Sequence, residues 1–247
     1  MTDKPKVRLF VDLPLAASAP VALSREQAHY LGGVMRQGAG DVVAVFNGRD
    51  GEWRARIDHL HRGNAALQCI DLVRAQKAEP DLWLLVAPIR KARFELVVEK
   101  ATELGVATIH PVVTRRSEVR EAKAERLAAI AIEAAEQCER LTVPAIAEAE
   151  PLARLLDRWP AGRRLFLCDE ARDAPSMAAA LAASPPCSAA ILIGPEGGFA
   201  PEEREMLRAR PFVTPVSLGP RVLRAETAAI VAVSLWQMLA GDRVANP

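Results

Sequence analysis

The sequence predicts an α/β protein in two parts, a small β-barrel followed by a mostly parallel sheet covered by helices. Short β-prone runs separated by tight turns fill the first seventy residues or so. A polar, proline-terminated stretch follows, and beyond it apolar runs of strand length alternate with helical periodicity to the end of the chain. We therefore expect a first domain over residues 1–73, a linker over 74–80 and a second domain over 81–247.

The first part contains β-prone runs at 7–11, 42–46, 52–60 and 65–73, and turn signals such as Asn47-Gly48 lie between them. One helical segment interrupts these runs. Ser24 and Gln27 have the spacing of a capping box, which predicts a helix that starts after Ser24 and continues through Val34.

The second part begins with the continuous apolar run 82–87, as expected of a strand that is buried on both faces. Apolar residues from Phe94 to Leu104 then recur at helical spacing, and Gly105 is placed to end that helix. The remaining expected elements are strand 106–113, helix 121–139, strand 165–168, helix 175–181, strand 189–193, helix 201–209, strand 213–218 and helix 225–240.

The last of these helices is apolar on nearly all sides, because Ile230, Val231, Leu235, Trp236 and Met238 cannot share one stripe. Such a helix lies either deep in a core or in a subunit interface. We favour the interface, since the helix ends a chain of moderate length.

Composition excludes several classes of protein. Half of the 247 residues are hydrophobic and the formal net charge is +1, so a nucleic-acid partner would have to meet a local basic patch. No signal peptide and no membrane-spanning run are visible, which predicts a cytoplasmic protein. The four cysteines, Cys69, Cys138, Cys168 and Cys187, show no C-x-x-C spacing, so neither a metal site nor a disulfide framework is expected.

Two glycine-bearing turns follow expected strands. Gly194-Pro195-Glu196-Gly197-Gly198 comes after 189–193, and the stretch 218–227, with Gly219, comes after 213–217. In an open α/β sheet this is the edge where ligands bind. Glycines there let main-chain groups approach an adenine or a ribose, although plain turn geometry explains them equally well. Neither turn has the pattern of a P-loop or of a dinucleotide fingerprint.

Charged residues accompany the same edge. Arg221, Arg224, Glu226 and Thr227 on the second turn suggest an anionic partner and a proton to be transferred. A further basic group follows the first two strands of the second part and comprises Arg90, Lys91, Arg93, Arg115 and Arg116. Singly these are ordinary solvated loop residues; as a set at one sheet edge they favour a phosphate-backbone partner.

These residues resemble a known family. The stretch 194–198, followed by Leu218-Gly219-Pro220-Arg221-Val222-Leu223-Arg224-Ala225-Glu226-Thr227, is similar to the paired cofactor motifs of the SPOUT RNA methyltransferases. The chain resembles most closely the ribosomal RNA small subunit methyltransferase E family, the 16S rRNA uridine-N3 methyltransferases. The likeness includes Arg8-Leu9-Phe10, the stretch 29–36, Phe46-Asn47-Gly48, the stretch 99–106 and the stretch 133–140.

The resemblance implies a PUA-like N-terminal barrel, a C-terminal trefoil knot, S-adenosylmethionine as cofactor, 16S rRNA of the small subunit as substrate and a homodimer. It also implies three sets of site residues. The catalytic residues are Arg224, which would stabilise charge, and Glu226, which is either the proton acceptor or the structural partner of an arginine. The cofactor-binding residues are Leu192, Ile193, Gly194, Glu196, Gly197, Gly198, Leu218, Gly219, Arg221, Val222, Leu223 and Thr227. The RNA-binding residues are Arg8, Arg36, Arg90, Lys91, Arg93, Lys100, Arg115 and Arg116.

Two alternatives stay open: a SPOUT methyltransferase that acts on another RNA or base, and a non-catalytic RNA-binding factor of ribosome assembly. The sequence also departs from the family pattern at two places. The loop at 88–93 lacks the glycine that many relatives carry beside its basic residues, and Ala200 stands where relatives often have a serine that would cap the next helix.

Overall fold

The chain divides into two compact units in the computed structural model, which describes residues 5–61, 63–119, 121–169, 173–183 and 188–242. The first unit takes the chain up to Ala78 and also residues 135–143, and the second takes the rest. No pattern in the sequence predicted that 135–143 pack with the first unit. The division into a domain over 1–73, a linker over 74–80 and a domain over 81–247 stays a prediction.

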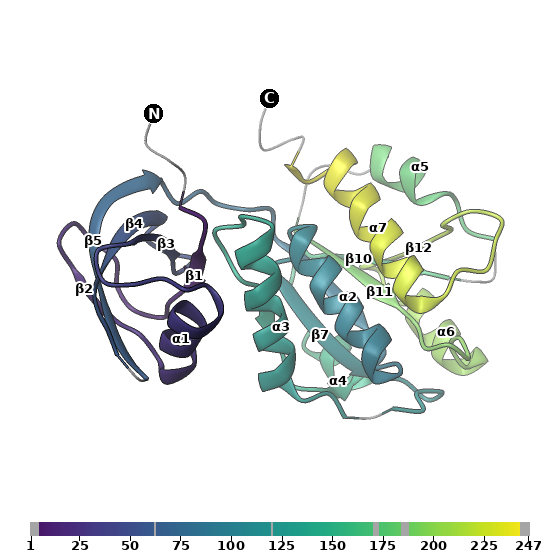
Figure 1. Cartoon of the computed structure of the whole chain (residues 1–247). Coiled ribbons are helices and arrows are strands. Elements are labelled where there is room, and N and C mark those ends of the chain that lie inside the picture. The colour runs from purple at the N-terminus through teal and green to yellow at the C-terminus, as the bar shows by residue number, and fades with distance from the viewer. Residues whose placement is uncertain (1–4, 62, 120, 170–172, 184–187, 243–247) are drawn as a thin grey trace. The chain divides into compact units, whose positions relative to one another are not determined.

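The first unit contains a five-stranded sheet in the order β1-β3-β4-β5-β2 (Figure 1). Its strands are β1 (Arg8–Phe10), β2 (Pro20–Ala22), β3 (Val42–Phe46), β4 (Glu52–His61) and β5 (Asn64–Arg74). Strand β1 pairs with β3 in parallel, and the other pairs are antiparallel. Alternate residues such as Val43, Val45, Ile57 and Leu67 point into one core. Only β2 was missed, because three residues that begin with a proline carry little strand signal.

The predicted helical segment of this unit is confirmed as α1 (Arg25–His29), which continues into a π-helical turn, η1 (Tyr30–Val34). The capping box is present. The backbone N–H of Gln27 donates to Ser24 Oγ at 3.1 Å, and the backbone N–H of Ser24 donates to Gln27 Oε1 at 3.0 Å.

The second unit is built on a sheet in which every pairing is parallel, in the order β12-β10-β11-β6-β7-β8, with the short β9 also beside β7. Its strands are β6 (Leu82–Val86), β7 (Thr108–Val113), β8 (Ala145–Ile146), β9 (Glu150–Pro151), β10 (Arg164–Cys168), β11 (Ala189–Ile193) and β12 (Val213–Val216). The mostly parallel α/β arrangement is therefore confirmed. Strand order alone does not establish the trefoil knot, which stays a prediction.

The helices are α2 (Lys91–Glu103), α3 (Ala124–Gln137), α4 (Leu152–Asp157), α5 (Met177–Ala182), α6 (Pro201–Arg208) and α7 (Ala225–Leu239). Helix α7 packs between α2 and α5 and lies against β11 and β6 (Figure 1). Leucines of α4 and α6 form a separate core with Leu85, Leu167 and Leu192. Because side chains alternate along a strand, this core lies on the opposite face of the sheet from α7.

Helix α7 is less enclosed than its composition suggests. Ala229, Ala232, Val233 and Trp236 are buried against the unit, whereas Met238 is 67% exposed and Leu239 is 43% exposed. The helix therefore has one face in the core of its own unit and a second apolar surface at its C-terminal end.

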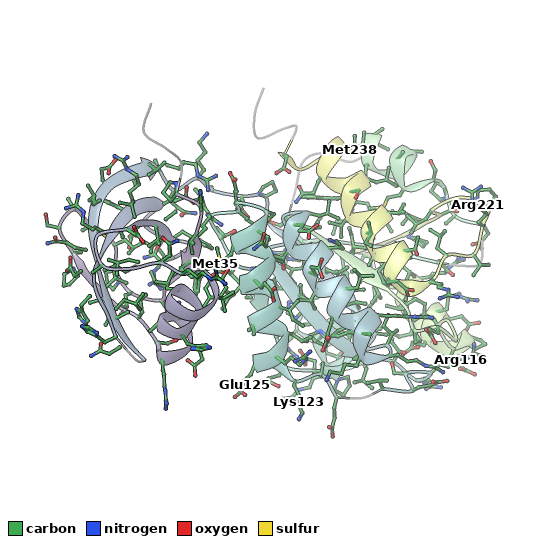
Figure 2. All side chains as sticks on the ribbon, viewed as in Figure 1. Met35, Arg116, Lys123, Glu125, Arg221 and Met238 are labelled. Atoms are coloured by element: carbon green, nitrogen blue, oxygen red, sulfur yellow. The ribbon has the colours of Figure 1, made fainter. Side chains whose placement is uncertain are left out.

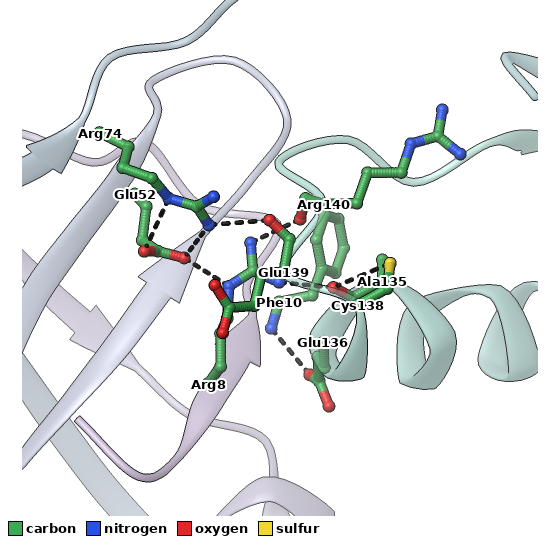
Figure 3. A network of polar contacts seen from close by, with 9 residues as sticks. All are labelled: Arg8, Phe10, Glu52, Arg74, Ala135, Glu136, Cys138, Glu139 and Arg140. Carbon is green, nitrogen blue, oxygen red and sulfur yellow. Dashed lines mark hydrogen bonds and ion pairs between the residues drawn. The ribbon is translucent and has the colours of Figure 1, made fainter. Parts of the chain in front are cut away.

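A network of polar contacts in the first unit joins two stretches of the family likeness (Figure 3). The carboxylate of Glu52 on β4 accepts hydrogen bonds from Arg8 on β1 and from Arg74 on β5. Arg8 also donates to the carbonyl oxygens of Ala135 and Arg140, and Arg74 donates to the carbonyl of Glu139 at 2.8 Å. The two arginines thus satisfy backbone carbonyls at the end of α3, which a helix cannot satisfy internally.

This network shows where one predicted RNA-binding residue lies. Arg8 was expected to contact RNA, but its side chain is only 10% exposed, and its guanidinium lies over the Phe46 ring at 3.7 Å in addition to its hydrogen bonds. Burial lowers the pKa of Arg8, against the opposing effect of Glu52. Arg8 is a structural residue of the first unit.

No described helix is both long and apolar enough to cross a membrane. Cys69, Cys138 and Cys168 are free thiols, and Cys187 lies outside the described residues.

Candidate functional site

Three neighbouring parallel strands end level at one edge of the second sheet. Cys168 at the end of β10 is in register with Ile193 at the end of β11 and with Val216 at the end of β12. The chain leaves all three strands in the same direction, so the segments that follow them meet. Two of these segments are the glycine-bearing turns singled out in the sequence.

A cavity of about 370 Å³ lies between these segments, a volume within the usual range of small-molecule sites. Its wall consists of Arg93, Cys168, Asp169, Ile193, Gly194, Pro195, Glu196, Gly198, Phe199, Ser217, Leu218, Gly219, Arg221, Val222, Leu223, Arg224, Ala225 and Ala228. The two turns therefore face one common space, as the sequence predicted.

Most of the predicted cofactor residues line this cavity, namely Ile193, Gly194, Glu196, Gly198, Leu218, Gly219, Arg221, Val222 and Leu223. Three others do not belong to its wall. Leu192 points to the opposite face of β11, where it packs with α4 and α6. The carbonyl of Gly197 accepts a hydrogen bond from Arg116 Nη1 at 2.9 Å, and Thr227 is exposed on α7.

The glycines have specific steric reasons to be there. A Cβ at Gly194 would lie 2.8 Å from the ring of Phe199, which is buried in the cavity wall. Gly219 has φ of +113°, a backbone conformation that other residues rarely adopt. The main chain of both turns is consequently open to a ligand.

The floor of the cavity includes Cys168 and Asp169, which the sequence analysis did not select. The Asp169 side chain is 0% exposed and pairs with Arg204 at 3.1 Å and Arg208 at 2.8 Å, both on α6. Burial raises the pKa of the Cys168 thiol to about 12, so the thiol is neutral at physiological pH. Their position directly after an apolar strand, at the same edge as the glycine turns, was the signal that could have identified them.

Arg93, predicted as an RNA-binding residue, lies between the two turns and lines the cavity. Its Nη1 donates to Glu196 Oε1 at 2.7 Å, and its Nε lies 3.6 Å from Glu226 Oε1. Glu226 is 9% exposed and is not part of the cavity wall. Of the two roles expected for Glu226, this geometry favours the structural partner of an arginine over the proton acceptor.

The remaining predicted RNA residues differ in their surroundings. Lys100 pairs with Glu99 and Glu103, which raise its pKa, and Arg115 lies 3.4 Å from Glu202. Arg90 and Lys91 are exposed at the start of α2, as are Arg221 and Arg224 at the cavity, and none of the four forms an ion pair with the residues described. Arg36 lies in the first unit, where it is exposed and has φ of +53°.

Exposed cations mark one end of the second unit. Arg116 follows β7 and Arg221 precedes α7, and both project at the end where α6 lies (Figure 2). The arrangement can hold a small ligand through main-chain groups and can attract an anion at the rim. Among the described residues, no three histidine, cysteine, aspartate or glutamate side chains are grouped as a metal site would require.

Family models match both parts of the chain. The model described as an RNA methyltransferase domain matches residues 76–237, and the model described as an RNA methyltransferase PUA domain matches residues 23–68. Proteins called ribosomal RNA small subunit methyltransferase E are similar over almost the whole chain. The protein from Rickettsia conorii is 32% identical over 94% of this chain and 95% of its own length, and that from Synechocystis is 34% identical over 92% and 76%.

Solved structures agree with this likeness. A ribosomal RNA small subunit methyltransferase E from Neisseria gonorrhoeae bound to S-adenosyl methionine has a TM-score of 0.84 and 26% identity, covering 96% of this chain and 98% of that one. A Legionella pneumophila protein in complex with the bound cofactor SAM has a TM-score of 0.84 and 30% identity, with the same coverage.

Proposed function

The chain belongs to the ribosomal RNA small subunit methyltransferase E family, and from this premise we propose that it transfers a methyl group from S-adenosylmethionine to N3 of a uridine in 16S rRNA. The observation that carries the proposal is the cavity at the sheet edge, which the two motifs of the family likeness enclose together. The expected RNA methyltransferase domain and PUA domain accompany it in the same chain.

The cavity fits the cofactor in size and in chemistry. Gly194 and Gly219 leave main-chain groups accessible for an adenine edge and ribose hydroxyls, while Phe199 and Leu223 supply apolar surface. When bound, S-adenosylmethionine supplies an activated methyl group, because its sulfonium leaves as a neutral thioether. The chain therefore needs only to bind, orient and exclude water at this end of the reaction.

Methylation at N3 requires that the uracil lose the N3 proton, which leaves negative charge on the neighbouring ring oxygens. Arg224 suits the stabilisation of that charge, because it lines the cavity, is exposed and stands at the N-cap position of α7. The positive end of the helix dipole acts in the same direction. We assign the N3 proton to solvent, because Glu226 pairs with Arg93 and is not part of the cavity wall.

The RNA approaches the same end of the unit in this proposal. Arg90, Lys91, Arg116 and Arg221 supply positive charge there for the phosphate backbone. A 16S rRNA substrate places the reaction in the cytoplasm of a bacterial cell, where small subunits assemble.

A homodimer is the third part of the proposal. It is supported by the exposed apolar end of α7, where Met238 and Leu239 would otherwise remain in water. The trefoil knot is proposed on the family resemblance alone.

The reaction is tested by transfer of an isotope-labelled methyl group to small ribosomal subunits that lack the modification, followed by nucleoside mass spectrometry. The label is expected on N3 of a uridine. Label on a cytidine, a guanosine or a ribose 2′-hydroxyl would refute the N3 assignment and leave the methyltransferase assignment intact. Absence of both transfer and S-adenosylmethionine binding would instead favour an RNA-binding assembly factor.

The role of Arg224 is tested by Arg224→Ala. We expect turnover to fall by about 100-fold or more, because one preorganised charge contact to a transition state is worth that much, while S-adenosylhomocysteine still binds. Unchanged turnover would remove Arg224 from the mechanism.

A further inference from the structure

Arg93 connects three segments that are far apart in the sequence. The residue itself lies in the first turn of α2, Glu196 lies in the turn after β11, and Glu226 lies in the first turn of α7. Its guanidinium is 2.7 Å from a Glu196 oxygen and 3.6 Å from a Glu226 oxygen, and the side chain is 35% exposed where it lines the cavity. One cation therefore reaches both motifs that enclose the proposed cofactor site.

Glu226 depends on this cation more than Glu196 does. The side chain of Glu226 is 11% exposed against 43% for Glu196. Glu226 Oε2 is buried and has no hydrogen-bond partner among the described residues. Removing Arg93 would leave a nearly buried carboxylate without its facing cation, a situation that is costly because the charge has lost its water as well.

We propose that Arg93 is a positioning residue that holds the turn at 194–198 and the start of α7 in one arrangement through Glu196 and Glu226. The inference rests on the proposed function, because the arrangement matters for a cofactor that touches both motifs at once. Its sequence position alone suggested that Arg93 binds the RNA backbone. In this proposal Arg93 instead affects the affinity for the cofactor.

The neighbouring cations provide the contrast. Lys91 lies two residues earlier on α2 and is exposed, with no ion pair among the described residues. Arg93, in contrast, donates a hydrogen bond to Glu196 and forms an ion pair with a second carboxylate, that of Glu226. A residue so engaged is poorly available to phosphates, whereas Lys91 is free to meet them.

The experiment is a calorimetric titration of S-adenosylhomocysteine into the intact protein, combined with KM for the ribosomal substrate. We expect Arg93→Ala to weaken S-adenosylhomocysteine binding by about tenfold, the lower part of the range for an uncompensated buried group, and to leave the KM for RNA unchanged. Lys91→Ala is expected to give the opposite pattern. Arg93→Lys should recover part of the affinity, because it keeps the charge but cannot address two carboxylates at once.

A double-variant cycle separates a brace from general damage. If Arg93 acts through Glu196, then Glu196→Gln weakens binding in the wild-type background, has a smaller effect in Arg93→Lys and has almost no further effect in Arg93→Ala. Arg126→Ala is the matched control, because it removes another arginine–glutamate pair with α2, through Glu95, away from the cavity. That variant should bind S-adenosylhomocysteine like the wild type.

The outcomes are distinguishable. A wild-type chain that does not bind S-adenosylhomocysteine would overturn the proposed function and this inference together. Wild-type binding with equal affinity in Arg93→Ala would overturn the inference alone, as would a raised KM for RNA at unchanged cofactor affinity. A Glu196→Gln effect that is as large in Arg93→Lys as in the wild type would also overturn it, even if Arg93→Ala fails to fold.

Discussion

Gly194 lies so close to the Phe199 ring that no methyl group fits between them. The nearest atoms to an added Cβ are carbons of the Phe199 ring at 2.8 and 3.0 Å, and that ring is 3% exposed. A ring in such a position moves only by displacing its own neighbours. The shape of the cavity therefore depends on a hydrogen atom at residue 194.

We predict that Gly194→Ala weakens S-adenosylhomocysteine binding by about tenfold. Displacing a packed side chain costs about 1–3 kcal/mol, and about 1.4 kcal/mol corresponds to a tenfold loss of affinity. Calorimetric titration measures the effect. Gly38→Ala is the control, since its added Cβ would meet only Asp41, at 4.0 Å. Equal affinities in the two variants would show that Phe199 yields without cost.

His110 on β7 gives a prediction at a different site. Its ring packs against Trp83 at a tilt of 42°, with 4.7 Å between centroids, and neither ring nitrogen has a hydrogen-bond partner among the described residues. Burial lowers the pKa of His110 to about 4; Glu150 opposes this effect, while Arg158 and Arg163 add to it. The unfolded chain, with a histidine pKa near 6.5, takes up this proton first.

Because the folded pKa is depressed, His110 stabilises the fold fully above about pH 6.5 and loses that contribution as the pH falls toward 4. Between pH 7 and pH 5 we expect a loss of about 1 kcal/mol from this group, after allowance for partial solvent access. Urea denaturation at the two pH values measures it. His110→Phe should reduce the difference, and His61→Gln, at an exposed strand residue, controls for the loss of a histidine.

At the scale of elements, the end of α3 depends on side chains from three strands. Glu52 is 5% exposed and holds Arg8 and Arg74 in place to bond the carbonyls of 135–140. Burial alone would raise the pKa of Glu52, but the hydrogen bonds from Arg74 and Arg8 outweigh burial and lower it. The carboxylate is consequently charged at neutral pH and shared by two guanidiniums.

We predict that Glu52→Ala lowers the free energy of unfolding by about 3 kcal/mol, because it leaves Arg8 buried without its counter-charge. Hydrogen exchange should quicken at the backbone of 135–143 in the same variant. Asp71→Ala is the matched control in the same sheet; its pair with Arg54 is partly exposed, so a loss of less than about 1 kcal/mol is expected. A similar loss in both variants would argue against a special role of Glu52.

The sequence predicted elements where a segment carries its own signal. The apolar runs that became β6, β10 and β11 and the capping box of α1 each had a local physical cause. Strands β8 and β9 have two residues each, too few to show a period. Helix α4 was missed as well, because it has only six residues and directly follows Pro151.

The candidate site was predicted to a different extent. Glycines directly after apolar strands identified the two turns, and these turns supply most of the cavity wall. The partners of Arg93 could not be predicted, because Glu196 and Glu226 come near it only through the order of the strands. For the same reason Arg8 looked like a free basic residue until Glu52 and the end of α3 were seen beside it.

For the whole molecule, the exposed end of α7 yields a prediction on assembly. Met238 and Leu239 are large apolar side chains that are exposed in the single chain. The variant Met238→Lys/Leu239→Lys is expected to convert a dimer to a monomer, because two like-charged surfaces would then face each other. Lysine also suits the C-terminal end of a helix, so the fold should tolerate it.

Size-exclusion chromatography with light scattering measures this change, and circular dichroism confirms that the variant is folded. A wild-type chain that elutes as a monomer would contradict the dimer. A variant that remains dimeric would place the interface elsewhere.

The return of residues 135–143 to the first unit has a consequence for synthesis on the ribosome. A nascent chain emerges from its N-terminus, and domains commonly fold as they become available. Here Arg8 and Arg74 are made long before the carbonyls of 135, 139 and 140 that they bond. The β unit therefore cannot complete its polar network until β6, α2 and β7 have already been translated, and its last step of maturation waits on the unit that follows it.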